Sequence, residues 1–124
     1  LKMIIIEKLR AICQQMPQYK EKMNVKVSPR PRDFYDIYTI LEKNETLKAD
    51  LLSSESRELI TDIFKIKKVP VTLLEHIKLE DTKKFHEQDF DTVRQTIYAS
   101  DNSKDFEFYY YYVCNLVKEI NLNN

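Results

Sequence analysis

The chain has 124 residues, a formal net charge of zero and no glycine. A Gly-rich phosphate loop needs backbone that approaches phosphate without a Cβ, so the sequence excludes the dinucleotide-binding, P-loop and kinase forms of this motif. Tight β-hairpins, whose two-residue turns favour glycine, are also disfavoured. The length suits one domain. We therefore expect an all-α fold over residues 1–124, a compact bundle of about five to six helices.

Apolar residues at helical spacing predict a first helix that ends before Pro17. No Ser, Thr, Asp or Asn precedes this helix to cap it, so we expect the chain to be a piece of a longer protein. Residues 17–32 are polar, basic and rich in proline, which predicts a loop of about 16 residues with at most a short strand around Val25 and Val27. The apolar residues of the first helix are Ile5, Leu9, Ile12 and Met16.

Further helices are expected in the middle of the chain. One opens at Asp33, a short one covers residues 47–52, and a longer one is capped by Ser54 or Ser56 and stops at Pro70. The first of these has an apolar face of Phe34, Ile37, Tyr38 and Leu41, and the last has one of Leu59, Ile60, Ile63 and Phe64.

The last third of the chain predicts a turn of helix over residues 73–77, a helix over 82–98, a polar break over 100–103 and a final helix. The run Tyr109–Tyr112 resembles a base-stacking platform. Four consecutive residues point all round a helix, however, so we expect most of these rings to pack. The inward residues of the final helix are predicted to be Phe106, Tyr109, Val113, Leu116, Val117 and Ile120.

Charge is divided unevenly along the chain. Residues 1–32 contain eight Lys or Arg and two Glu, whereas the remaining residues contain twelve basic and eighteen acidic side chains. The basic first quarter could contact an anionic ligand such as a nucleoside triphosphate or an RNA backbone. It could equally dock on the acidic remainder of this chain or on an absent partner domain, and composition leaves these alternatives open.

The chain shows no sign of export or membrane insertion. Residues 1–6 lack the length and the cleavage site of a secretory signal, and no apolar stretch approaches the ~20 residues that span a bilayer. We therefore expect a cytoplasmic protein without membrane contact, with Cys13 and Cys114 as reduced thiols. His76 and His86 have no companion at metal-ligand spacing, so we expect structural or surface roles for both.

Two segments carry a family resemblance. Residues 7–11 read EKLRA, and residues 30–38 read RPRDFYDIY. This pair of motifs resembles the C-terminal helical half of the AbiEii/AbiGii toxin family of nucleotidyltransferases. Weaker similarity extends through residues 64–70 (FKIKKVP) and 90–93 (FDTV) to the aromatic final helix. The resemblance implies the helical half of a polymerase-β-like enzyme that acts in type IV toxin–antitoxin or abortive-infection systems.

The same resemblance implies specific site residues. Lys8 would be the triphosphate-contacting lysine and Asp33 the active-site acid, so these two are the candidate catalytic residues. A lysine ammonium is a compact point charge suited to phosphate oxygens, and a carboxylate nearby can orient that lysine or accept the proton of an attacking hydroxyl. Supporting or nucleotide-binding roles would fall to Arg10, Arg30, Arg32 and Asp36.

Each candidate also has a structural interpretation. Asp33 could be the N-cap of the second helix, accepting the amide of Asp36. Asp36 could pair with Arg10 or Arg32, and a pair with Arg10 would lock the first two helices together. Lys8 on sequence alone is an ordinary solvated helix lysine.

The family's metal-binding half, with a Gly-Ser and an Asp-x-Asp pair, has no counterpart in this sequence. The single Asp-x-Asp, residues 89–91, lies in a helical stretch at the wrong end of the order, so we expect no metal site in this chain and acids at a helix start instead. We expect the chain to be inactive by itself, with Mg²⁺ and a nucleoside triphosphate bound only by the intact enzyme. The implied partners are the missing catalytic half, the nucleoside triphosphate and RNA. The chain could also form a homodimer through the surface that it would otherwise offer to the missing half. The alternative is a non-catalytic module that uses the basic segment 20–32 to bind RNA or an acidic protein.

Overall fold

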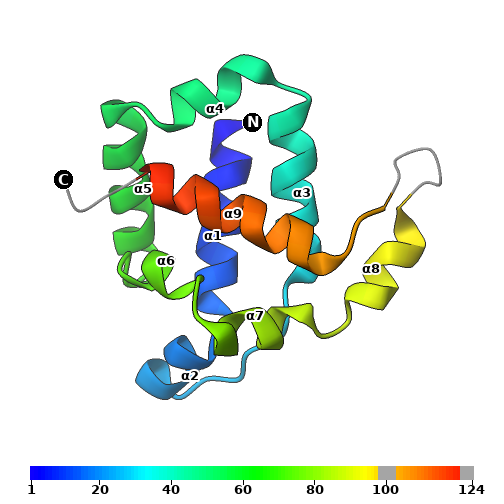
Figure 1. Cartoon of the computed structure of the whole chain (residues 1–124). Helices are drawn as coiled ribbons and strands as arrows, with labels where there is room; N and C mark the ends of the chain where they lie inside the picture. Colours follow the sequence, from blue (N-terminus) through cyan, green and yellow to red (C-terminus); the bar gives the residue numbers. More distant parts are fainter. Residues whose placement is uncertain (98–102, 121–124) are drawn as a thin grey trace.

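The computed structural model describes residues 1–97 and 103–120, apart from the side chain of Lys22. Within these ranges the chain forms helices and no strand, which confirms the all-α fold. The described residues contain nine helices, more than the five or six expected, partly because the predicted loop over residues 17–32 contains a helix and the helix predicted over residues 82–98 divides into two. They are α1 (Lys2–Gln14), α2 (Pro17–Met23), α3 (Pro31–Glu42), α4 (Glu45–Leu51), α5 (Ser54–Ile66), α6 (Leu73–His76), α7 (Glu80–Glu87), α8 (Phe90–Thr96) and α9 (Phe106–Ile120) (Figure 1).

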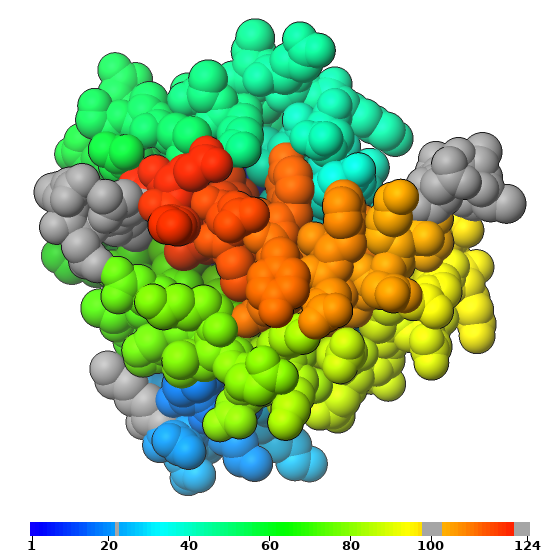
Figure 2. Space-filling model, in the orientation of Figure 1, coloured from blue at the N-terminus to red at the C-terminus, as the bar shows by residue number. Residues whose placement is uncertain are grey.

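Helix α1 lies at the centre of the bundle and runs antiparallel to α3, while α9 crosses in front of both (Figure 1). Its buried side chains recur at helical spacing as predicted, and each contributes roughly 1.5–3 kcal/mol of burial free energy. Helix α3 packs against both α1 and α9. In the space-filling view α9 runs across the front face, with α3 and α4 above it and α6 and α7 below it (Figure 2). The fully buried residues of α1 are Ile5, Ile6, Leu9, Ile12 and Cys13.

The predicted loop over residues 17–32 is partly wrong. Its first part forms α2, because Pro17 stands at the start of that helix, where proline's fixed φ and missing N–H are favourable. Residues 24–30 have no regular structure, and no strand forms at Val25 or Val27. Helix α3 likewise begins at Pro31, so Asp33 lies inside the first turn and is not the N-cap.

The single helix predicted over residues 82–98 is also wrong. The chain forms α7 and α8 instead, and Asp89 between them adopts a left-handed conformation with φ of 67°. That conformation cannot continue a right-handed helix. Residue 98, and residues 100–102 of the predicted polar break, lie outside the described residues.

The predicted capping residue of α5 was wrong. The Ser53 hydroxyl accepts the backbone N–H of Ser56 at 3.2 Å, so Ser53 is the N-cap in place of Ser54 or Ser56. The Ser56 hydroxyl instead donates to the carbonyl of Asp50 at 2.6 Å and joins α4 to α5. Helix α5 ends at Ile66, four residues before Pro70, because Lys68 has φ of 59°.

Other expectations concern single side chains. In α9 all the predicted inward residues are buried except Val117, which is half-buried, and Tyr110 joins them. Cys13 and Cys114 are free thiols, the first buried and the second half-buried. None of the helices in the described ranges has the length and the apolar composition needed to cross a membrane.

Candidate functional site

The two motifs meet where α1 packs against α3. Lys8 on α1 donates from Nζ to Oδ1 of Asp33 at 3.1 Å and to Oδ2 of Asp36 at 2.9 Å. Asp33 and Asp36 are three residues apart in the first half of α3, so their carboxylates share one face of the helix, as expected. The fold therefore joins Lys8 and Asp33, which are 25 residues apart in sequence.

Two arginines extend this contact into a charged network of Lys8, Arg30, Arg32, Asp33 and Asp36. Arg30 donates from Nε to Oδ2 of Asp33 at 2.7 Å. Arg32 donates from Nε to Oδ1 of Asp36 at 3.1 Å and from Nη1 to the Thr96 hydroxyl at 2.5 Å. With three cations and two carboxylates, the network carries an excess of one positive charge.

Burial differs sharply within the network. The Asp33 side chain is only 3% exposed, whereas that of Lys8 is 23% exposed and that of Arg30 is 45% exposed. A buried carboxylate is tolerated only where its oxygens are paired. Both oxygens of Asp33 accept a charged donor, so the network meets this condition while its cations still reach solvent.

The protonation state of Lys8 follows from the same contacts. Burial by itself would lower the pKa of Lys8, but the hydrogen bonds and charges of Asp36 and Asp33 outweigh it and raise that pKa above its ordinary value. Lys8 is therefore an ammonium at neutral pH. It can neutralise an anion but cannot accept a proton.

Arg10 does not make the predicted pair with Asp36. Its guanidinium instead donates to Glu7 at 2.6 Å and to Gln14 at 2.6 Å, within α1. Lys8 occupies the side of α1 that faces α3 and takes the contact with Asp36 that was assigned to Arg10. A salt bridge between the two helices was thus predicted correctly, but its cation is Lys8 and not Arg10.

A shallow depression of about 360 Å³ opens beside the network. Its floor includes Lys8 and Asp33, and its rim carries Met3 and Ile4, whose side chains are 48% and 46% exposed. Two larger cavities of about 610 Å³ each lie elsewhere, one between α8 and α9 and one between α6 and α9. The depression is lined by Met3, Ile4, Glu7, Lys8, Arg10, Ala11, Arg30 and Asp33.

Sequence reasoning missed the contribution of His86 on α7. Its Nδ1 accepts the backbone N–H of Arg30 at 2.9 Å, at the residue that caps α3. Burial lowers the pKa of His86 to about 4, so its ring is neutral at neutral pH and Nδ1 is free to accept. His86 therefore has the structural role expected for it, because it holds the backbone of Arg30, whose side chain pairs with Asp33. His76 is exposed. The sequence hinted at a buried His86 only through its spacing from Thr82, four residues earlier, which puts both side chains on one face of α7. Both are fully buried.

The carboxylates of the described residues do not fit a metal ion. Residues 1–97 and 103–120 contain no group of three or more His, Cys, Asp or Glu side chains placed to hold one. Asp33 and Asp36 are already paired with three cations, which a divalent cation would have to displace. Asp91 lies in the first turn of α8, is 93% exposed and approaches Arg94 at 3.9 Å.

The family assignment rests on a comparison with protein-family models. The model described as the nucleotidyl transferase AbiEii toxin of type IV toxin–antitoxin systems matches residues 1–110, which include the whole charged network. The chain belongs to the AbiEii family. This confirms the resemblance carried by the two motifs and supports a nucleotidyltransferase-like function in a type IV toxin–antitoxin system. No curated protein and no solved structure matches the AbiEii chain significantly.

Among the side chains that the structure describes, four of the first quarter's eight basic residues pair with carboxylates in the acidic remainder of the AbiEii chain. Lys2 contacts Asp50 at 3.2 Å, and Lys8, Arg30 and Arg32 contact the carboxylates of α3. This is the docking alternative that composition had left open. It also reduces the positive charge of the basic segment 20–32, because both of its arginines are engaged.

Proposed function

We propose that this AbiEii chain is the helical part of a nucleotidyltransferase toxin and that Lys8 contacts the triphosphate of its nucleotide substrate. The observation that carries the proposal is the contact of Lys8 with Asp33, at 3.1 Å, between the two motifs. The two carboxylates, one of them buried, fix the position of the Lys8 ammonium between the two motifs. The family membership gives the chemistry in which a fixed ammonium is required.

The geometry leaves Lys8 able to bind a phosphate. An ammonium has three N–H donors, and Asp33 and Asp36 use two of them. The remaining donor belongs to a side chain that is partly exposed and lines the shallow depression. A phosphate oxygen entering there would meet Lys8 together with the exposed parts of Arg30 and Arg10, which line the same depression.

Asp33 orients Lys8 in this proposal. Of the two roles suggested for this carboxylate, the pairing of both oxygens with cations favours positioning over proton acceptance from an attacking hydroxyl. Asp36 shares that task, and Arg30 and Arg32 hold the two carboxylates in turn. Nucleotidyl transfer depends mainly on positioning and on neutralising phosphate charge, and a pre-oriented ammonium supplies both.

Metal chemistry is assigned to a different part of the enzyme. The Mg²⁺ that such a transfer uses would stabilise the charge on the phosphates, but the carboxylates described above do not fit it. We propose that a separate catalytic half supplies the metal ligands and that the AbiEii chain transfers no nucleotide by itself. Labelled transfer from a nucleoside triphosphate by the purified chain would contradict this part of the proposal.

The test is a calorimetric titration of the chain with each nucleoside triphosphate and with inorganic tripolyphosphate. Lys8→Met should weaken triphosphate binding about tenfold, the equivalent of one charge-assisted contact of ~1.4 kcal/mol. Lys2→Met is the matched control, because Lys2 lies on the same helix and also pairs with a carboxylate. Equal losses in the two variants would reduce the role of Lys8 to general charge and refute the assignment.

A further inference from the structure

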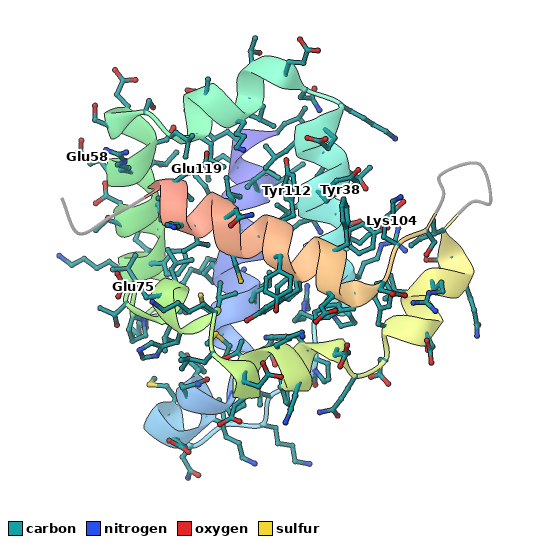
Figure 3. The ribbon with its side chains drawn as sticks, viewed as in Figure 1. Tyr38, Glu58, Glu75, Lys104, Tyr112 and Glu119 are labelled. Carbon is teal, nitrogen blue, oxygen red and sulfur yellow. The ribbon has the colours of Figure 1, made fainter. Side chains whose placement is uncertain are left out.

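The aromatic run of α9 forms a second feature that the proposed transfer site does not use. Tyr109 and Tyr110 are buried as expected, but the rings at the crossing of α9 and α3 reach the surface. Tyr38 of α3 packs edge-to-face against Phe108, Tyr109 and Tyr112, with centroid distances of 5.0, 5.4 and 5.1 Å. Figure 3 shows Tyr38, Tyr112 and Lys104 gathered on the face where the two helices cross.

A groove of about 360 Å³ follows this crossing, and we call it the aromatic groove. Its aromatic part is Tyr35 and Tyr38, both half-buried, above the buried Tyr109. Its polar part is the exposed pair Lys43 and Lys104, with Thr39 and Glu42 between them and the rings. The groove is lined by Tyr35, Tyr38, Thr39, Glu42, Lys43, Lys104 and Tyr109.

Cations also stand over the rings around the groove. The guanidinium of Arg32 lies 5.5 Å from the centre of the Tyr35 ring, and the ammonium of Lys104 lies 6.0 Å from that of Phe108. The ammonium of Lys48 lies 5.9 Å from the ring of Tyr112. Partly exposed rings with cations close by are the combination by which proteins hold single-stranded nucleic acid, because bases stack on the rings and phosphates pair with the cations.

We propose that the aromatic groove binds a short single-stranded segment of nucleic acid, with one base against Tyr35 and Tyr38 and the flanking phosphates at Lys43 and Lys104. The volume suits one nucleotide and not a duplex. The Glu42 carboxylate accepts the Tyr112 hydroxyl at 3.2 Å and can also accept an exocyclic amino group of a base. The rings and the lysines together favour this occupant, because an acidic protein surface would pair with Lys43 and Lys104 but offer no base to stack, and an apolar surface would not pair with them.

The lining of the aromatic groove shares no residue with the depression at Lys8. From the basic segment 20–32, Arg32 contacts both the charged network and the edge of the groove, since it pairs with Asp36 and lies over the Tyr35 ring. Binding in the groove requires no nucleotidyl transfer. The groove proposal can therefore fail while the assignment of Lys8 holds, and the assignment of Lys8 can fail while the groove proposal holds.

The experiment is a fluorescence-anisotropy titration of the 124-residue chain with labelled oligo(U) and oligo(dT) at several salt concentrations. Lys43→Glu/Lys104→Glu should abolish most of the binding and should flatten the salt dependence by about 1.4 log units per log unit of salt, the value for two single-strand phosphate contacts. The matched control is Lys65→Glu/Lys67→Glu on the exposed end of α5, which changes the net charge equally and should retain most of the binding. The comparison of the two oligomers tells whether the 2′-hydroxyl contributes.

Variants of Tyr38 test the stacking. Tyr38→Leu removes the ring face and should weaken binding about tenfold, whereas Tyr38→Phe keeps the ring and should bind as the parent does. Circular dichroism shows whether the Tyr38→Leu variant is folded. If it is not, the comparison of Lys43→Glu/Lys104→Glu with its control variant tests the proposal. No binding at low salt, or equal losses in the two lysine pairs, would overturn the proposal. So would self-association that Lys43→Glu/Lys104→Glu abolishes, because the groove would then be an interface between copies.

Discussion

The ion pair of Lys8 and Asp33 should stabilise the fold, because the Asp33 carboxylate is buried, and a double-mutant cycle measures its contribution. The variants are Lys8→Met, Asp33→Asn and their combination. Removing Lys8 leaves Asp33, which is 3% exposed, with Arg30 as its remaining cation. A buried carboxylate stripped of every partner costs ~3–5 kcal/mol, so the loss of one of two partners should lower the free energy of unfolding by about 2 kcal/mol.

The coupling energy of the cycle should be smaller than that, because Lys8 is partly exposed. Charge-assisted hydrogen bonds contribute ~1.5–3 kcal/mol when buried, and exposed ion pairs ~0–1 kcal/mol, so we expect about 1.5 kcal/mol. Urea denaturation followed by circular dichroism measures the four free energies of unfolding. The matched control cycle is Lys2→Met with Asp50→Asn, a more exposed pair that joins α1 to α4, for which we expect ~0.3 kcal/mol. A coupling for Lys8 no larger than that of the control would refute the argument from burial.

Three more outcomes are expected. The pKa of His86 is about 4 in the folded chain against an ordinary 6.5, so between these pH values the unfolded chain binds a proton that the folded chain does not bind. The free energy of unfolding should therefore be highest above pH 6.5 and fall by about 3 kcal/mol as the pH falls towards 4. Urea titrations of His86→Asn should lack this decrease. Burial raises the pKa of the Cys13 thiol, so a thiol reagent should modify Cys13 only on unfolding and the half-buried Cys114 sooner, and the opposite order in mass spectrometry would be a failure. Ser53→Ala should lower the unfolding free energy by ~1 kcal/mol and Ser54→Ala should not; equal effects would contradict the cap assignment.

The periodic apolar residues predicted much of the fold. The first helix, the long helix through Ile60 and Phe64, and the final helix carry a buried residue at every third or fourth position, and a pattern repeated that often leaves little choice of secondary structure. The breaks were harder to predict. Asp89 and Lys68 adopt left-handed conformations without glycine, so the sequence contains no ordinary signal that a helix ends there.

The candidate site was predictable for a different reason. Motif resemblance named Lys8 and Asp33, and helix geometry put Asp36 on the same face as Asp33. The structure brings Lys8 into contact with both carboxylates, and the roles assigned to these residues stay predictions. The rotation of α1 against α3 decides which cation reaches Asp36, and local sequence patterns do not determine that rotation. The predicted pairing of Arg10 with Asp36 was therefore wrong. The contact of His86 with the backbone of Arg30 spans 56 residues, and no local pattern encodes it.

We propose that Asp33 and Asp36 hold the Lys8 ammonium in place for a phosphate. NMR of the chain labelled at the lysine side-chain carbons, titrated with tripolyphosphate, observes that ammonium directly. If the proposal is correct, the Lys8 resonance shifts earliest and most among the lysines, and Lys8→Met removes the strongest binding. A Lys8 resonance that stays in place while the exposed lysines shift would contradict it.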